Sequence, residues 1–124
     1  MDVNQREMFP RLLIKGIEEF NRQEYFACHE TLETLWQREK EPERLLTQAI
    51  IQFAVGYYHW QRANFQGAQR LFERGLAKID KEKSHPLTCA SPIDIQDLVD
   101  QIVSDMPNVI AGKKLSKFPV IRFL

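Results

Sequence analysis

Apolar residues recur every three to four positions along most of this chain, a spacing typical of helices that bury one face. No stretch alternates apolar and polar residues strictly enough to predict a strand. We expect the first helix to be kinked or to begin again at Pro10, and the last helix to end before Pro107, because proline removes a helical hydrogen bond. The pattern predicts five helices, at about residues 5–20, 24–40, 41–63, 66–81 and 93–104, followed by an extended tail that lies on the bundle.

An internal repeat relates the first two predicted helices to the next two. In each copy a helix leads into a short turn with an aromatic residue after it, and a small residue stands where the second helix crosses the first. These units resemble tetratricopeptide hairpins, but two are too few for a solenoid. We therefore predict an all-α fold, one compact bundle of two tetratricopeptide-like hairpins capped by the fifth helix and the tail. The matching positions, forty residues apart, are Gly16/Gly56, Phe20/Trp60, Arg22/Arg62, Tyr25/Phe65, Cys28/Ala68, Leu32/Phe72 and Glu33/Glu73.

The length and charge of the chain narrow the classes of protein it could be. A chain of 124 residues is large enough to bury a core, and we expect residues 1–124 to form a single domain. Its 17 basic residues balance 17 acidic ones, which argues against nucleic-acid binding because that binding depends on neutralising phosphates. No apolar run is long enough to span a membrane, and the polar first residues do not resemble a signal peptide. Two cysteines in different settings give no disulfide pattern, so we expect a cytoplasmic protein.

The stretch YFACHETLETLW places polar residues beside the apolar face of the second predicted helix. His29 and Glu33 are four residues apart and therefore share one face, whereas Glu30 points away from the core. A histidine and a carboxylate at this spacing can bind one metal ion, and Glu30 could then serve as a general base. The predicted core stripe of this helix consists of Tyr25, Cys28, Leu32, Leu35 and Trp36.

The third predicted helix, LLTQAIIQFAVGYYHW, is apolar on most of its circumference. Its polar exceptions, Gln48, Gln52 and His59, fall on one line, and an unpaired buried polar group costs about 1–3 kcal/mol. We therefore predict a polar seam between the second and third helices. Its members are His29, Glu33, Gln52 and His59, with Glu30, Trp36 and Tyr57 nearby.

Three interpretations of this seam are open. It could be a satisfied hydrogen-bond network that fixes the register of the two helices. It could instead hold a divalent metal or a small ligand, or, with Glu30 as base, carry out hydrolysis. The hairpin repeat favours a different class, a non-enzymatic interaction module with a protein partner or a second copy of the chain.

The residues FNRQEYFACHETLETLW, followed by QAIIQFAVGYYHWQRANFQGAQRLFERGL, resemble the bacterial and archaeal family named domain of unknown function 309. The similarity covers about residues 16–76; Ala63-Asn64 stands where Gly-Asn is usual in the family, and Thr31 occupies a usually apolar position. The resemblance implies an all-α bundle. The family has been labelled a predicted metal-dependent hydrolase, and the residues that inherit this label are His29, Glu30, Glu33 and His59.

Overall fold

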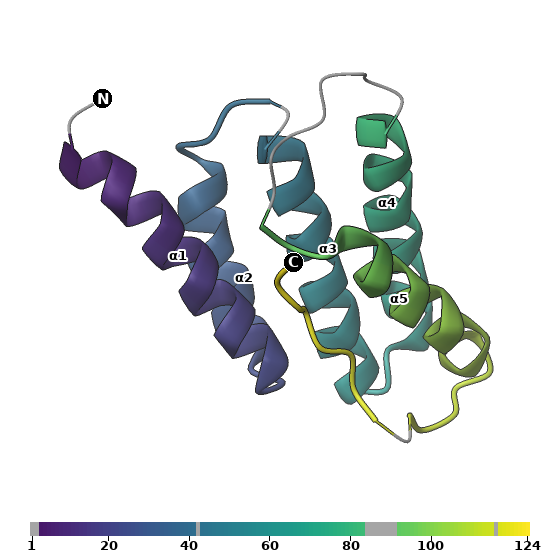
Figure 1. Cartoon of the computed structure of the whole chain (residues 1–124). Coiled ribbons are helices and arrows are strands. Elements are labelled where there is room, and N and C mark those ends of the chain that lie inside the picture. The colour runs from purple at the N-terminus through teal and green to yellow at the C-terminus, as the bar shows by residue number, and fades with distance from the viewer. Residues whose placement is uncertain (1–2, 42, 84–91, 116) are drawn as a thin grey trace.

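The helices follow one another in space in the same order as in the chain, each packing against the next (Figure 1). This computed structural model describes residues 3–41, 43–83, 92–115 and 117–124, with side chains outside residues 3–10 and 81–83. Over these ranges it contains five helices and no strand, and together they form the predicted all-α bundle. The helices are α1 (Val3–Asn21), α2 (Tyr25–Trp36), α3 (Glu43–Gln61), α4 (Phe65–Lys83) and α5 (Ile95–Ile110).

Of the two alternatives predicted at Pro10, a second start of the helix does not occur, and the predicted end of the last helix before Pro107 is wrong. The first helix is a single element, Val3–Asn21, and does not begin again at Pro10. The last helix continues through Pro107 to Ile110. The proline costs helix stability, but the apolar stripe of α5 continues beyond it, and Val109 is fully buried. Burial of this last turn outweighs the hydrogen bond that the proline removes.

The two hairpins, α1–α2 and α3–α4, share the same turn. Gln23 and Ala63, forty residues apart, both adopt the left-handed backbone conformation, with φ of 65° and 59°. In each turn the residue that follows donates its N–H to the equivalent carbonyl near the end of the preceding helix. Glu24 donates to Glu19 at 2.9 Å, and Asn64 donates to His59 at 2.8 Å. The repeat in the sequence is therefore a repeat in the backbone.

The crossings inside the two hairpins are also equivalent. A Cβ atom added at Gly16 would lie 2.4 Å from Leu32 Cδ2, and one added at Gly56 would lie 2.6 Å from Phe72 Cε1. Only glycine allows the helices of each hairpin to approach this closely. The small residues predicted at the crossing therefore include the glycines of α1 and α3 as well as Cys28 and Ala68 of the partner helices, all four of which are buried.

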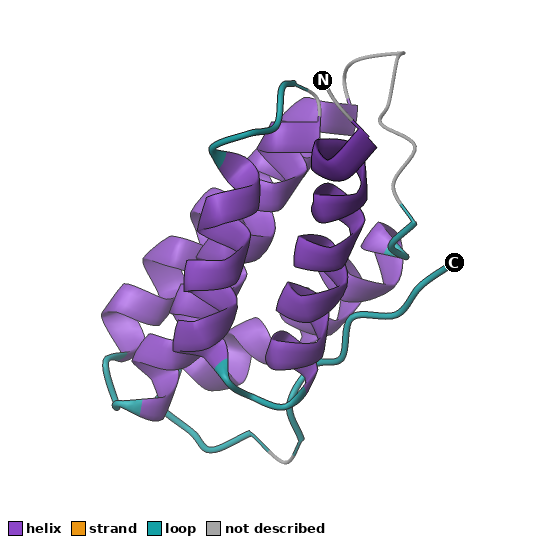
Figure 2. Cartoon of the chain, turned by 90° about the vertical axis from the view of Figure 1, so that its left-hand side faces the viewer, coloured by secondary structure: helices purple, strands orange, loops and turns teal. Residues whose placement is uncertain are grey.

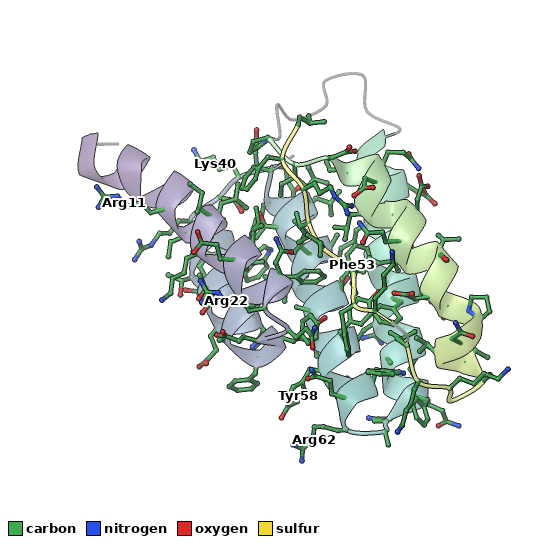
Figure 3. The ribbon with its side chains drawn as sticks, turned by 60° about the horizontal axis from the view of Figure 1, so that its bottom comes forward. Arg11, Arg22, Lys40, Phe53, Tyr58 and Arg62 are labelled. Carbon is green, nitrogen blue, oxygen red and sulfur yellow. The ribbon has the colours of Figure 1, made fainter. Side chains whose placement is uncertain are left out.

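Aromatic side chains fill the centre of the bundle, where Phe53 lies in the middle of the view (Figure 3). Phe20 meets the rings of Tyr25 and Tyr57 edge-on, with centroids 5.3 and 6.1 Å apart. The ring of Tyr57 also contacts Phe72 at 4.6 Å, so this cluster joins all of the first four helices. Edge-on aromatic contacts of this kind stabilise the core beyond simple burial.

The tail (residues 113–124) runs in front of α3, between α1 and α5 (Figure 1), and lies along the outside of the bundle (Figure 2). As predicted it is extended, and an isolated antiparallel bridge pairs Phe123 with Ile93. The segment between the fourth and fifth predicted helices, which we expect to be a loop at residues 84–92, lies almost entirely outside the described ranges. Among the described helices, none combines the length and the apolar character needed to cross a membrane.

Candidate functional site

His29 and Glu33 of α2 contact each other, as their spacing predicts. His29 Nε2 lies 3.1 Å from Glu33 Oε2, and the two side chains are 28 % and 47 % exposed. The other ring nitrogen of His29, Nδ1, is buried and has no hydrogen-bond partner among the described residues. The His29 ring also lies beside the exposed Phe26, which contacts Tyr58 of α3. The pair therefore lies at the solvent edge of the α2–α3 interface.

Gln52 and His59 of α3 have partners in α4 and in the α3–α4 turn instead of on α2. Lys78 Nζ donates a 2.8 Å hydrogen bond to Gln52 Oε1, and His59 Nδ1 lies 3.3 Å from Asn64 Nδ2 in the α3–α4 turn. The structure thus gives Gln52 and His59 partners other than the predicted ones, His29 and Glu33. Within the described part of the chain, no three histidine, cysteine, aspartate or glutamate side chains gather so that they could hold a metal ion.

The remaining predicted residues lie in three different surroundings. Glu30 is exposed and lines a shallow groove between α1 and α2 together with Glu19. Trp36 is half-buried, and the guanidinium of Arg44 lies 4.1 Å from the centre of its ring. Tyr57 is fully buried and faces α5. These three side chains do not form one site with the His29–Glu33 pair.

In the second hairpin, an equivalent pair of side chains makes the same kind of contact as His29 and Glu33. Gln69 and Glu73 stand forty residues later, and Gln69 Nε2 donates a 2.9 Å hydrogen bond to Glu73 Oε1. A neutral amide thus makes the same contact, four residues apart on a helix, that the imidazole makes in the first hairpin. The contact at His29 therefore has the geometry of a repeated helix-stabilising pair.

A network of side chains joins α2, α3 and α5 at Asp105, a half-buried residue that the sequence pattern did not single out. The Tyr57 hydroxyl donates a 2.7 Å hydrogen bond to Asp105 Oδ2, and the Tyr57 ring stacks on Tyr25. Burial raises the pKa of Asp105 above its ordinary value of 3.8, and the bond from Tyr57 opposes this shift. Burial and the neighbouring carboxylate raise the pKa of Tyr57, so its hydroxyl stays protonated and donates.

Two side-chain amides hold the main chain of the tail. Gln101 of α5 donates from Nε2 to the Val120 carbonyl at 2.8 Å, and its Oε1 accepts from the Val120 N–H at 2.9 Å. Asn21, the last residue of α1, donates to the Ile121 carbonyl at 3.0 Å and accepts from the Ile121 N–H at 2.7 Å. Successive residues of an extended segment point their N–H and C=O groups to opposite sides. These two amides, which we call the amide clamps, therefore bind adjacent residues from both sides.

The clamp on α5 is itself held in place. Gln101 Nε2 also donates a 2.8 Å hydrogen bond to Asp97 Oδ2, and the same oxygen receives Arg122 Nη1 at 2.9 Å. Further along, the Asp94 N–H donates to the carbonyl of Arg122 at 2.8 Å. The hydrogen bond to Asp97 lies within α5 and orients the amide of Gln101 toward the tail, which lowers the entropy lost when the tail binds.

Over residues 119–122 the side chains of the tail alternate in exposure, as expected for an extended segment. Pro119 and Ile121 are buried, whereas Val120 and Arg122 are exposed. Phe118 packs against the rings of Trp60 and Tyr25, with centroids 5.2 and 6.2 Å apart. We call the surface beneath the tail the inner groove; the residues that line it are Asn21, Tyr25, Trp60, Asp97 and Gln101.

Sequence reasoning missed both clamps for a physical reason. The sequence pattern singled out neither Asn21 nor Gln101. A side-chain amide that binds a distant main chain leaves no spacing pattern, because its partner lies 100 residues away for Asn21 and 19 for Gln101. The one available signal was that Gln101 and Asp105 are four residues apart beside the apolar stripe of α5.

Comparison with known proteins agrees with the resemblance of the sequence. Residues 13–71 match the profile of the family described as Domain of unknown function (DUF309). The chain contains a domain of this family. The Uncharacterized protein YpuF of Bacillus subtilis (strain 168) is 35 % identical over 77 residues, which are 60 % of this chain. The chain spans 44 % of the length of YpuF, less than half of that relative.

The DUF309 domain contains one side of the inner groove. Asn21 and Trp60 lie within residues 13–71, as do all the residues to which the resemblance assigns a metal site. Asp97, Gln101 and the tail lie beyond the matched stretch. The DUF309 match therefore covers the two hairpin turns but not α5 and the segment that α5 binds.

Proposed function

We propose that this protein is a non-enzymatic interaction module that binds an extended peptide segment of a partner protein in its inner groove. The observation that carries the proposal is the pair of amide clamps, which bind both main-chain groups of Val120 and of Ile121. Main-chain hydrogen bonds recognise an extended segment whatever its side chains, as in strand addition to a sheet edge. In this proposal the tail is the resident occupant of a peptide site.

The arrangement of the helices supports the same function. Two tetratricopeptide-like hairpins followed by a further helix form a short helical array, and such arrays offer the surface between their stacked helices to ligands. The tail runs in front of α3, between α1 and α5 (Figure 1), and contacts Asn21 at the end of α1, Trp60 of α3 and Gln101 of α5. It thus lies where a helical-repeat protein would hold an extended ligand.

A metal or small-ligand site at His29, Glu30, Glu33 and His59, with Glu30 as a base for hydrolysis, is the second candidate. The buried and unpartnered Nδ1 of His29 is the observation in its favour. Metal analysis of protein purified without a histidine tag tests it. Fewer than about a tenth of chains carrying zinc, manganese, iron or nickel would contradict it, because such sites bind tightly. The cytoplasmic location stays a prediction from the sequence.

Peptide binding to the 124-residue chain tests the proposed function. Ile121 is 2 % exposed, so Ile121→Asp places a carboxylate in the apolar part of the groove and weakens the docking of the tail. The probe is a fluorescein-labelled peptide of residues 117–124, KFPVIRFL, and binding is followed by fluorescence anisotropy. We expect saturable binding to the variant. Wild type should bind at least about tenfold more weakly, because its tethered tail competes at roughly millimolar effective concentration.

Two further variants make the result decisive. In the Ile121→Asp chain, Asn21→Ala should weaken peptide binding, whereas Gln61→Ala, the exposed equivalent in the second hairpin, should leave it unchanged. Arg122→Glu, at an exposed position, releases the tail more gently if Ile121→Asp lowers helicity. Circular dichroism confirms that each variant is folded. Folded variants that fail to bind the peptide would show that the groove is not a peptide site.

A further inference from the structure

We infer that the inner groove selects a basic peptide that carries an aromatic residue, an aliphatic residue three positions later and an arginine directly after it. This inference rests on the proposed function and names the ligand of that site. The tail itself carries the pattern at Phe118, Ile121 and Arg122. Main-chain clamps alone would accept any extended segment, so selection has to come from the side-chain contacts that accompany them.

The aliphatic position is set by burial. Ile121 is 2 % exposed, and Pro119, two residues earlier on the same side of the extended segment, is buried as well. A polar side chain at the Ile121 position would lose its water without gaining a partner, which makes the position selective for apolar groups. The Asn21 clamp holds the main chain of this same residue, so the side chain cannot turn away from the core.

The aromatic position is set by two rings of the bundle. Phe118 meets Trp60 of α3 edge-on, with an interplanar angle of 75°, and also contacts Tyr25 of α2. Edge-on contacts between rings add attraction beyond the buried area, and an aliphatic side chain would lose them. The Trp60 ring is held in turn by its own N–H, which donates a 3.2 Å hydrogen bond to the Lys113 carbonyl.

The basic character follows from the charge of α5. Asp97 binds Arg122 at 2.9 Å, and Asp97, Asp100 and Asp105 line a cavity of about 300 Å³ that also touches Lys117 and Phe118 of the tail. Complementary charge across an interface selects partners and speeds their encounter. A peptide with acidic residues at the Lys117 and Arg122 positions would meet like charge along this side of the groove. The cationic residues of the tail are Lys113, Lys114, Lys117 and Arg122.

The tail also regulates the site, because a partner peptide has to displace it. A ligand that binds only the small fraction of chains with an open groove shows an apparent affinity lowered by that fraction. Partners with the full pattern should therefore compete with the tail, whereas segments that only offer a main chain should not.

A series of peptides bound to the Ile121→Asp chain tests the selection. Parent KFPVIRFL is compared by anisotropy with peptides that carry Phe118→Ala, Ile121→Ala or Arg122→Glu. Each change should weaken binding at least about fivefold, through lost ring contact, lost burial or charge repulsion. The control peptide carries Leu124→Ala, because that side chain is 85 % exposed, and it should bind like the parent. Added salt should weaken the parent peptide and spare the Arg122→Glu peptide.

Exchanging the two charges of the Asp97–Arg122 ion pair distinguishes charge selection from a general disturbance of the groove. Asp97→Lys in the Ile121→Asp chain should recover binding of the Arg122→Glu peptide and weaken binding of the parent peptide. If the dissociation constants of all the peptides agree within about twofold, the groove recognises only the main chain. The inferred side-chain selection is then wrong, while the proposed function stands. If the parent peptide does not bind at all, the proposed function itself fails.

Discussion

The two hairpins share a scaffold and differ in the residues that face the tail. Both have the same left-handed turn, the same glycine at the helix crossing and the same polar pair four residues apart on their second helix. At the turn, however, Asn21 holds the main chain of the tail, whereas its equivalent in the second hairpin, Gln61, is exposed. Features that repeat therefore serve the scaffold, whereas the amide of Asn21, which occurs once, holds the tail.

The largest effect should come from breaking the shared crossing. Gly56→Ala would push a Cβ atom to within 2.6 Å of the buried Phe72 ring, and Gly16→Ala would meet the more flexible Leu32. Overpacking of this kind costs typically about 1–3 kcal/mol of unfolding free energy, with the larger loss expected at Gly56. Urea denaturation measures both variants. If the unfolding free energy of each variant changes by less than about 0.5 kcal/mol, the helices do not approach closely at the two glycines.

The next effect separates the two turns. Asn21→Ala leaves the N–H and C=O of the buried residue Ile121 without their side-chain partners, which should lower the unfolding free energy by about 1–2 kcal/mol. Gln61→Ala removes an exposed side chain and should change it by less than about 0.5 kcal/mol. Thermal and urea denaturation compare the pair directly. Equal losses would contradict a special role for the first turn.

The two hairpins also differ in their contact with Asp105. Tyr57 of the second hairpin donates a hydrogen bond to Asp105, whereas the equivalent residue of the first hairpin, Ile17, is apolar and has no side-chain donor. Protonation of Asp105 tests this contact. The folded-state pKa of Asp105 is raised above 3.8, so the folded chain holds this proton to higher pH than the unfolded chain does. The stability that this proton contributes is fully present below the ordinary pKa of 3.8. It is lost as the pH rises through the raised pKa of the folded chain. Unfolding free energy should therefore fall more steeply with pH above 3.8 in wild type than in Asp105→Asn. Parallel pH profiles, measured by urea denaturation, would contradict the shift.

The smallest effect is expected at the polar pair that both hairpins share. His29→Gln copies Gln69 and should keep the contact with Glu33, so stability should change by less than about 0.5 kcal/mol. The reciprocal variant, Gln69→His, should be equally mild. A metal site predicts otherwise: added divalent metal would raise the melting temperature of wild type and not of His29→Gln. That response would restore the metal interpretation of the His29–Glu33 pair.

The sequence predicted the parts of the molecule that depend on local spacing. The forty-residue repeat anticipated both crossings, and the spacing of His29 and Glu33 anticipated their contact. The face of α3 that carries Gln52 was not predictable, because a helix that is apolar on most sides gives no orientation, and Gln52 bonds to Lys78 of α4. The end of α5 was misjudged because packing beyond Pro107 outweighs the loss at the proline. The groove depends on contacts between distant residues that no periodicity records.

The carboxamide signals of the clamps test the central claim most directly. In a ¹⁵N-labelled Ile121→Asp chain, the side-chain amides of Asn21 and Gln101 are observed by nuclear magnetic resonance while unlabelled KFPVIRFL is added. We expect both signals to shift and their exchange with water to slow, because the peptide main chain replaces water at the same atoms, while the Gln61 amide stays unchanged. Peptide binding that leaves both clamp signals unmoved, or no binding by the folded chain, would contradict the proposal that the inner groove is a site for extended peptides.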